Sequence, residues 1–328
     1  MDLVIDHHST TPKYQQLIDI IIQGIAKNNF HSGDQLPSVN QLCKNQNLSR
    51  DTVFKAYSQL KDDGIIEAVA NKGYYIANET RKVFLLLDTF KAYKEVLYDS
   101  FIKNLAPNII ADVHFHHYNI EIFKTLINEG LHKYSKFIVM PFDNPKIKEV
   151  LSSIPEEKLL IIDWDIQSNE YQNKLYQDFG FSLYNCLEES LHLLKKYKEF
   201  HFIYPKYTHH PPTAIENFEK FCKDHQIPFS IIRDPESFKI KKSSAYLSVS
   251  DRMLGRFLEQ ARKFEFEPGR DVGIISYNET PMKKFIYKGI TVISTDFEAL
   301  GEQAAKFVTT NTVMNLQVPT KLIIRKSI

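Results

Sequence analysis

Residues 36–64 of the chain read LPSVNQLCKNQNLSRDTVFKAYSQLKDDG, and this stretch decides the fold of the N-terminal part. Pro37 and Ser38 stand where a helix can begin, and Ser49 can cap a second helix by accepting a backbone N–H from its first turn. Apolar residues recur three and four positions apart in both segments, as a single buried helical face requires. The stretch therefore predicts two short helices joined by a tight turn at residues 45–47.

The second of these helices has two unlike faces. The residues predicted to face inward are Val53, Ala56, Tyr57 and Leu60. Helical spacing then turns Asp51, Lys55 and Ser58 outward. A short helix that presents donors on its outer face fits a DNA major groove, where side chains reach base edges and phosphates.

The flanking sequence completes a three-helix arrangement. Thr11 as cap and Pro12 at the first helical position predict the start of a preceding helix with one continuous apolar stripe. Residues 65–77, IIEAVANKGYYIA, predict two short strands around a turn at Lys72 and Gly73. Three helices followed by a β-hairpin make a winged helix-turn-helix.

Several motifs in this region occur together at fixed spacing. They are Gly-x-x-Leu-Pro-Ser at 33–38, Ser-Arg-x-Thr-Val at 49–53 and Ala-Tyr-x-x-Leu at 56–60. With these motifs, residues 12–77 resemble the DNA-binding domain of the GntR (gluconate repressor) family. The residues that this resemblance leads us to expect at the DNA are Ser38, Asn40, Ser49, Arg50, Thr52 and Lys55, with Asn71, Lys72 and Gly73 at the tip of the wing.

Two departures from the family pattern, together with the charge of this region, bear on which operator DNA the domain binds and how tightly. Asn40 replaces a frequent Arg, and Phe54 stands where a basic residue is common in the family, so the operator sequence is not transferable from relatives. Residues 1–80 carry seven Lys and Arg against nine Asp and Glu, a net charge of −2. Because phosphate contacts supply much of the affinity for DNA, we expect weak binding of one half-site and a homodimer on double-stranded operator DNA. A winged helix that contacts another protein is the alternative.

Length and composition bound the rest of the molecule. At 328 residues, with 43% hydrophobic and 25% charged residues, the chain is expected to form two or three globular units. No apolar run is long enough for a membrane span and the N-terminus lacks a signal-peptide pattern, so we expect a cytoplasmic protein without a membrane partner. A polar stretch at 78–81 predicts a linker between a DNA-binding domain at 1–77 and an effector-binding and dimerisation domain at 82–328.

Strand and helix patterns alternate through the second domain. Such alternation, with nearly continuous apolar strands, predicts parallel sheets covered on both faces, arranged as two doubly wound α/β lobes. The predicted strands lie at 83–87, 109–115, 137–140, 159–162, 200–204, 227–232, 245–249, 271–275 and 290–294.

Polar residues follow several of these strands, where ligands of doubly wound folds bind. Carboxylates accept sugar hydroxyls, and an aromatic plane such as Trp164 covers the apolar face of a sugar ring. Each Asp is alternatively a helix cap, and Trp164 is alternatively a loop aromatic that covers the core. The candidate effector-binding residues are Asp88, Tyr93, Asp143, Asp163, Trp164, Asp251 and Asn278.

Residues 82–328 also resemble a known family, that of the lactose repressor and the periplasmic sugar-binding proteins. The resemblance is carried by the segments at 248–259, 268–281 and 290–308. It implies effector contacts by Asp251 and Asn278, and it places Thr295 at a crossing between lobes. The helices that we expect at a dimer interface lie near 91–104, 119–133 and 296–309.

Departures from the second family leave the effector unnamed. Ser250 replaces the usual Asn, Asn278 replaces the usual Asp, and Ala214 stands in place of a common Arg unless His209 or His210 substitutes for it. A GntR-type head on a lactose-repressor-type body resembles arabinose-responsive repressors, and similar hybrids regulate fucose use. We therefore expect a repressor of sugar-utilisation genes with a monosaccharide effector; the alternative is a sugar-binding sensory protein whose winged head contacts another protein.

Catalysis and metal binding have little support in the sequence. The group His114, His116 and His117 lacks the neighbouring Cys or acid at helical spacing that a metal site needs, so we expect no metal and no cofactor. Gly-x-Ser-x-Gly, P-loop and Gly-x-Gly-x-x-Gly motifs are absent, which favours a binding protein over an enzyme.

Overall fold

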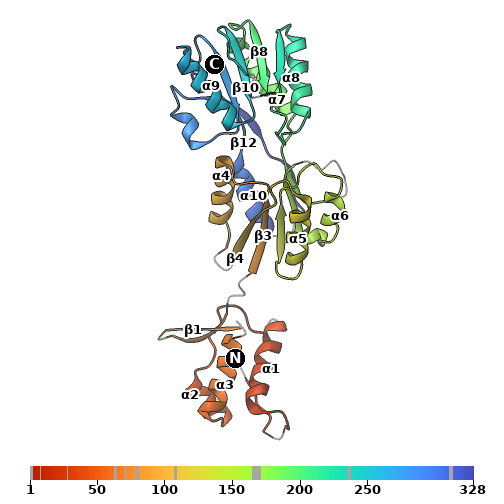
Figure 1. The fold of residues 1–328 in the computed structure, drawn as a ribbon. Coiled ribbons are helices and arrows are strands. Elements are labelled where there is room, and N and C mark those ends of the chain that lie inside the picture. The colour runs from red at the N-terminus through yellow and green to blue at the C-terminus, as the bar shows by residue number, and fades with distance from the viewer. Residues whose placement is uncertain are drawn as a thin grey trace. The chain divides into compact units, whose positions relative to one another are not determined.

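The computed structural model of the chain describes residues 3–7, 9–27, 29–62, 65–70, 72–77, 81–106, 109–164, 171–234, 238–309 and 313–328. Asn71 and most of the predicted linker at 78–81 lie outside these ranges. The chain divides into two compact units, Met1–Arg81 and Lys82–Ile328, each with its own hydrophobic core (Figure 1).

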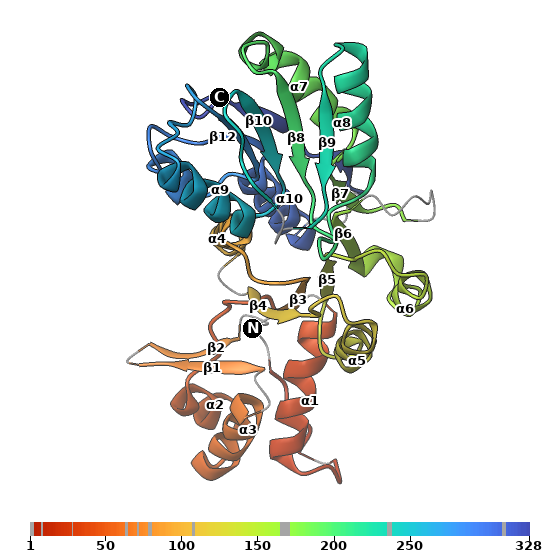
Figure 2. The ribbon, with the colours of Figure 1, turned by 45° about the horizontal axis from the view of Figure 1, so that its top comes forward.

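The N-terminal unit is a three-helix domain with a β-hairpin (Figure 2). The inward residues predicted for the helix that follows the turn are all buried, at 0% exposure. Its strands pair antiparallel. The elements are α1 (Lys13–Ala26), α2 (Val39–Gln46), α3 (Arg50–Asp62), β1 (Ile66–Val69) and β2 (Gly73–Ile76).

Of the two caps that the sequence predicts in this unit, the one at Ser49 is confirmed, and Ser38 provides a further cap. Ser38 and Gln41 form a capping box at the start of α2, and Ser49 Oγ accepts the backbone N–H of Thr52 at the start of α3 (3.1 Å). The predicted cap at Thr11 is wrong. Pro12 itself occupies the N-cap position of α1, and the helix has no side-chain cap because Pro12 carries no hydrogen-bonding side chain.

The C-terminal unit consists of two α/β lobes, and all nine predicted strands are present. Strand order is β13-β7-β6-β5-β3-β4 in the first lobe and β14-β12-β11-β10-β8-β9 in the second. The first-lobe elements are β3 (Arg81–Leu87), α4 (Ala92–Lys103), β4 (Ile109–Phe115), α5 (Ile120–Gly130), β5 (Lys136–Val139), α6 (Ile147–Leu151), η1 (Glu156–Lys158), β6 (Leu159–Asp163), β7 (Lys174–Tyr176), α10 (Phe297–Thr309) and β13 (Asn315–Gln317). The second-lobe elements are α7 (Phe181–Leu194), β8 (Glu199–Ile203), α8 (Thr213–Asp224), β9 (Phe229–Ile232), β10 (Ser244–Ser248), α9 (Asp251–Lys263), β11 (Gly273–Tyr277), η2 (Pro281–Lys284), β12 (Thr291–Thr295) and β14 (Thr320–Ile323).

Both sheets are covered on both faces, as the continuous apolar strands predict. In β3, Val83 and Leu85 belong to the core that includes residues of α4 and α10, whereas Phe84 and Leu86 belong to the core that includes residues of α5 and α6. Figure 1 shows these two pairs of helices on either side of β3. The recorded strand pairs are parallel except for β12 with β14, which is antiparallel. Successive side chains of a strand point to opposite faces, so one apolar run supplies two core layers.

The chain passes between the lobes three times: after β7, after β12 and after β13. The three segments are joined to each other. The backbone N–H of Val318 donates to Tyr176 O (2.7 Å), and that of Asp296 donates to Pro319 O (3.0 Å). The sequence prediction missed the short strands β7, β13 and β14 that flank these passages. Thr295, at the end of β12, lies at such a crossing, as the resemblance implied.

Candidate functional site

The outer face of α3 is held in place by contacts on its inner face. Tyr57, buried within the N-terminal unit, donates its hydroxyl hydrogen to Pro37 O (2.7 Å), which fixes α3 against the start of α2. Burial raises the pKa of Tyr57, so its hydroxyl stays a neutral donor. The side chains of Asp51, Lys55 and Ser58 are exposed on the opposite side, as predicted.

Polar side chains gather at the start of α3. Ser49 Oγ and Thr52 Oγ1 lie 2.7 Å apart and share a hydrogen bond. Arg50 is exposed and makes no ion pair or side-chain hydrogen bond with any residue that the structure describes. Lys55 is partly engaged, because its Nζ lies 3.8 Å from the centre of the Tyr14 ring. Arg50 is therefore the cation most available to a phosphate or a base at this end of the helix.

The hairpin and the start of α2 hold the other residues of this group. Lys72 is exposed, and its carbonyl accepts hydrogen bonds from Gln35 Nε2 (2.8 Å) and Tyr75 Oη (3.3 Å). Gly73 has a φ of 107°, a conformation that side chains disfavour and glycine allows. Ser38 and Asn40 are exposed at the first turn of α2.

A cavity of about 470 Å³ lies between the two lobes of the C-terminal unit. It is lined from the first lobe by residues that follow β3 and β6, and from the second lobe by residues that follow β8, β10 and β11. Six of the seven predicted effector-binding residues line it: Asp88, Tyr93, Asp163, Trp164, Asp251 and Asn278. The seventh, Asp143, lines an adjoining cavity instead.

The first-lobe wall of this cavity satisfies its own charges. Asp88, 5% exposed, forms an ion pair with the fully buried Lys94 and accepts a hydrogen bond from the Tyr118 hydroxyl. Burial lowers the pKa of Lys94 to about 8, and nearby Asp163 acts in the opposite direction. Burial also raises the pKa of Tyr118 to about 12. Asp88 is thus held by one cation and one phenol of the first lobe.

Asp163 joins the cavity to the crossings between the lobes. Its carboxylate accepts a hydrogen bond from Gln177 Nε2, and Gln177 Oε1 accepts one from Thr295 Oγ1 (2.6 Å). Burial raises the pKa of Asp163, while Lys94 and the Gln177 hydrogen bond oppose that rise. Thr295 Oγ1 also lies 2.9 Å from Thr320 Oγ1, so side chains of all three crossings meet next to the cavity.

The second-lobe wall also pairs its charges. Asp251, the first residue of α9, forms an ion pair with Lys283 (2.7 Å). Lys283 is buried and donates to Tyr277 O (3.0 Å) and Asn278 O (2.7 Å). Burial lowers the pKa of Lys283, and Asp251 opposes this effect. The pair holds the loop that begins with Asn278 against the start of α9.

Three polar atoms on the second-lobe wall have no partner among the described residues. They are His210 Nε2, Tyr277 Oη and Asn278 Oδ1, and all three residues line the cavity. Tyr277 is only 3% exposed. Burial lowers the pKa of His210 to about 3, which keeps its ring neutral and its free nitrogen able to accept or donate. A buried polar group without a partner is costly, so these atoms point to a ligand.

Sequence reasoning found only part of this wall. His209 and His210 are possible replacements for an arginine and Asn278 is a candidate contact on sequence grounds, but Tyr277 is not among the predicted residues. A tyrosine that ends an apolar strand before Asn-Glu was the available signal. His209 makes a different contact: its ring stacks on Tyr118 of the first lobe, with 3.5 Å between ring centres and 10° between planes. This stack closes one side of the cavity.

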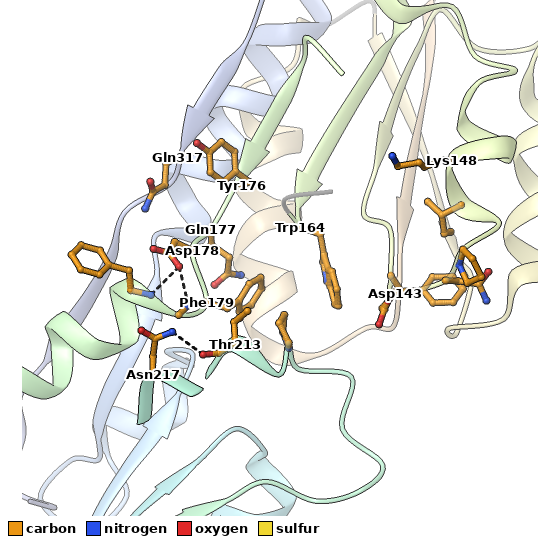
Figure 3. A pocket seen from close by; sticks show the side chains of 17 residues that line it. Asp143, Lys148, Trp164, Tyr176, Gln177, Asp178, Phe179, Thr213, Asn217 and Gln317 are labelled. Atoms are coloured by element: carbon orange, nitrogen blue, oxygen red, sulfur yellow. Dashed lines mark hydrogen bonds between the residues drawn. The ribbon is translucent and has the colours of Figure 1, made fainter. Parts of the chain in front are cut away.

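The adjoining cavity, about 840 Å³ in volume, is larger but differs in chemistry (Figure 3). Trp164, Phe179 and Gln177 line both cavities, and the rings of Trp164 and Phe179 lie 6.1 Å apart. Figure 3 shows two of its polar side chains bonded within the protein: Asp178 Oδ1 accepts the backbone N–H groups of Gly180 and Phe181, and Asn217 Nδ2 donates to Thr213 O (3.0 Å). The unpartnered atoms identify the smaller cavity as the better candidate site.

The histidine cluster of the first lobe is structural. His116 is buried, with Nε2 3.0 Å from Met140 O, and its Nδ1 accepts the backbone N–H of Tyr118 (3.1 Å). His114 stacks on Phe84. Within the described ranges no group of three His, Cys, Asp or Glu is arranged to hold a metal ion. A helix long and apolar enough to cross a membrane is likewise missing from those ranges.

Comparisons with known proteins fit both units. Residues 13–76 match the model of the family described as bacterial regulatory proteins, gntR family. The HTH-type transcriptional repressor YtrA of Bacillus subtilis (strain 168) is 33% identical over 125 residues, which are 38% of this chain and 88% of that protein. This match covers most of the relative and identifies the N-terminal unit.

The C-terminal unit resembles solved regulators in fold. A LacI family transcriptional regulator from Lactobacillus casei, solved with bound glucose, has a TM-score of 0.63 at 14% identity and covers 76% of this chain and 100% of its own. The dimeric Lac repressor with an 11-residue C-terminal deletion has a TM-score of 0.63 at 16% identity, covering 75% of this chain and 98% of its own. A LacI-type fold is thus joined here to a gntR-type head, and the chain belongs to the gntR family of bacterial transcriptional regulators.

Proposed function

We propose that this regulator binds operator DNA through two winged heads of a homodimer, and that a monosaccharide in the cavity between the lobes changes this binding. In this proposal residues 1–77 bind DNA, 78–81 link, and 82–328 bind the effector and dimerise. The observation that carries it is the set of unpartnered polar atoms of the second-lobe wall, in a cavity that the first lobe closes. The protein acts as a cytoplasmic repressor and leaves its ligand chemically unchanged, without a cofactor.

The DNA contacts are assigned from the free groups of the head. Arg50 at the start of α3 is exposed and unpaired within the described residues, so it is the donor best placed for phosphate or a guanine edge. Ser49 and Thr52 stand beside it, and Ser38, Asn40 and Lys55 present further polar groups on α2 and α3. Lys72 and Gly73 of the hairpin reach the neighbouring groove, together with Asn71.

The effector contacts are assigned from the cavity. A sugar offers hydroxyls that both donate and accept, which suits Tyr277 Oη, His210 Nε2 and Asn278 Oδ1. Trp164 and Tyr93 add aromatic surface for the apolar face of a ring. The LacI family regulator from Lactobacillus casei was solved with glucose, which supports a carbohydrate in a cavity of this fold.

Regulation requires that the ligand bind one state of lobe closure better than another. The cavity has walls from both lobes, so closure brings both sets of contacts onto the ligand. For the dimer we propose α4, α5 and α10 of the first lobe. Helices α4 and α10 pack closely, since a Cβ at Gly301 would lie 2.4 Å from Leu97 O, and a change in one is therefore passed to the other.

A gel-shift titration tests the DNA half of the proposal. Operator fragments are first selected from genomic DNA, and Arg50→Ala is then compared with Lys27→Ala, which removes the same charge from the exposed C-terminal end of α1. Loss of the Arg50 contact is expected to weaken binding by about 1–3 kcal/mol and to reduce the salt slope by about one. Equal effects of the two variants, or no operator preference in the parent protein, would contradict the proposal.

A thermal-shift screen with monosaccharides tests the effector half. A ligand that binds the folded state alone raises the melting temperature, and the shift grows with its concentration over Kd. The stabilising sugar is then added to the gel-shift reaction. The proposal requires that the same sugar alter operator affinity in the parent protein; a sugar that stabilises the protein and leaves operator affinity unchanged speaks instead for a sensory protein whose head contacts a protein partner.

A further inference from the structure

The charged groups left without a partner in the cavity are cations. Each acid in its lining already has a partner: Asp88 has Lys94 and Tyr118, Asp163 has Gln177, and Asp251 has Lys283. Two cations in the same lining, Lys91 and Arg252, make no ion pair or side-chain hydrogen bond with the residues that the structure describes. The cavity thus offers a ligand more positive charge than negative charge.

Lys91 and Arg252 come from opposite walls. Lys91 is the N-cap residue of α4 in the first lobe, and Arg252 is the second residue of α9 in the second lobe. Both side chains are exposed within the cavity lining, so both can turn toward a ligand. The nearby acids Asp251 and Asp163 attract Lys91, but neither lies within ion-pair distance of it.

Two helices also begin at this cavity. Helix α4 has 12 residues and α9 has 13, and neither has a side-chain cap at its N-terminus. Free backbone N–H groups and the positive end of the helix dipole favour an anion at such positions. A separate observation also points to a ligand. The buried hydroxyl of Tyr277, in the same lining, has no hydrogen-bond partner among the described residues.

We propose that the effector is an acidic sugar, one that carries a phosphate or carboxylate group on a polyhydroxylated body. Lys91 and Arg252, with the first backbone N–H groups of α4 and α9, hold the acidic group. Tyr277, His210 and Asn278 meet the hydroxyls. This inference rests on the proposed function, because it assumes that the cavity binds the effector.

The acids of the cavity lining already have partners within the protein, and this favours an acidic ligand. A neutral sugar would leave Lys91 and Arg252 without partners, and the carboxylates that it meets already take part in contacts with Lys94, Gln177 and Lys283. An oxyanion accepts several charge-assisted hydrogen bonds at once, which are stronger than bonds between neutral groups. Because the two cations lie on different lobes, a ligand that contacts both would draw the lobes together.

Calorimetric titration of the full chain with matched pairs of sugars tests this inference. The probes are glucose with glucose 6-phosphate and glucuronate, galactose with galacturonate, and ribose with ribose 5-phosphate, with inorganic phosphate as a competitor. At least one acidic member is expected to bind about tenfold or more tightly than its neutral parent, and more weakly at higher salt. The phosphate and uronate probes show which acidic group fits.

Lys91→Gln and Arg252→Gln locate the effect. Each is expected to remove most of the preference for the acidic member of the pair. The matched controls Lys103→Gln and Lys263→Gln lie in the last turns of the same two helices, outside the cavity lining, and should keep the preference.

Three outcomes would overturn the inference. If neutral sugars bind as tightly as their acidic derivatives, the acidic-sugar inference falls and the proposed carbohydrate effector stands. If no member of any pair binds, both fall together. Tight binding of an acidic sugar that Lys91→Gln and Arg252→Gln leave unchanged would also contradict the assignment, since the acidic group would then be held elsewhere.

Discussion

The two walls of the cavity between the lobes are built on different principles. On the first-lobe wall Asp88 forms an ion pair with Lys94 and accepts a hydrogen bond from Tyr118, so its charge is balanced within the protein. On the second-lobe wall His210 and Tyr277 keep polar atoms without a partner. A complete network stabilises the protein and fixes a surface, whereas an incomplete one costs stability until a ligand arrives. The difference suggests that the Asp88 network is structural support, whereas the unpartnered atoms of the second wall are kept for the ligand.

The largest predicted effect comes from breaking the first wall. Lys94→Met leaves Asp88 buried without its ion-pair partner, and such an uncompensated charge costs about 3–5 kcal/mol of the free energy of unfolding. Denaturant unfolding of the C-terminal transition measures it. The double variant Lys94→Met with Asp88→Asn should recover most of the loss because it removes both charges. A Lys94→Met variant as stable as the parent would show that the ion pair between Lys94 and Asp88 does not stabilise the first lobe.

Acid should weaken the first lobe through His116. Burial lowers its pKa from 6.5 to about 4, and both ring nitrogens are already engaged, with Nδ1 accepting a backbone N–H. Above pH 6.5 the contribution of His116 to stability is complete, and it is lost as pH falls toward 4, because only the unfolded chain takes up the proton. The full loss is on the order of 3 kcal/mol.

Melting temperatures recorded between pH 7 and pH 4.5 measure this effect. His116→Asn should flatten the acid limb of the curve, although its own stability at pH 7 will be lower. His132→Asn, a change in the loop after α5, serves as the control and should keep the parent slope. An unchanged slope in His116→Asn would mean that another group governs the acid response.

Removing one hydroxyl from the second wall should weaken ligand binding without lowering the stability of the ligand-free protein. Tyr277→Phe deletes a buried hydroxyl that has no protein partner, so the stability of the ligand-free protein should stay the same or rise slightly. Binding of the effector found in the screen should weaken by about 0.5–1.5 kcal/mol, the usual contribution of one hydrogen bond. Calorimetry on the free and bound protein gives both numbers. A clear loss of stability without loss of binding would assign Tyr277 to the support and not to the ligand.

The smallest predicted effect lies where the walls meet. His209→Ala removes the stack with Tyr118, and an aromatic pair of this kind contributes about 0.5–1.5 kcal/mol. We expect the lower end, because His209 is an exposed residue. Small-angle scattering of the isolated C-terminal unit should show a slightly larger radius of gyration in the variant without ligand. Identical profiles would indicate that the stack does not hold the lobes together.

The sequence predicted the parts of the molecule that local patterns determine. Ser49 and the spacing of Val53, Ala56 and Tyr57 were sufficient for α3, since capping and helical periodicity are local. The nine strands followed from apolar runs for the same reason. The short strands β13 and β14 escaped because their residues are mostly exposed or alternate in burial, so no apolar run marks them.

The cavity was less predictable than the fold. Strand ends pointed to the region of the six lining residues, whereas Asp143, after β5, lines only the neighbouring cavity, which Trp164 also borders. Whether Tyr277 Oη finds a partner depends on every neighbouring side chain, which no single stretch of sequence contains. Lys94 and Lys283 were missed for a similar reason: a lysine in a helix or a loop is exposed in most proteins.

Lateral bonds between the three connecting segments limit how the two lobes can move. The backbone hydrogen bonds of Val318 and Asp296, with the side-chain hydrogen bonds from Thr295 to Gln177 and Thr320, join the three connecting segments side by side. Segments joined in this way can bend together, but they cannot slide past one another without breaking these hydrogen bonds. Gln177 also donates a hydrogen bond to Asp163, which lines the cavity. A ligand that contacts Asp163 therefore acts on the segments about which the two lobes bend.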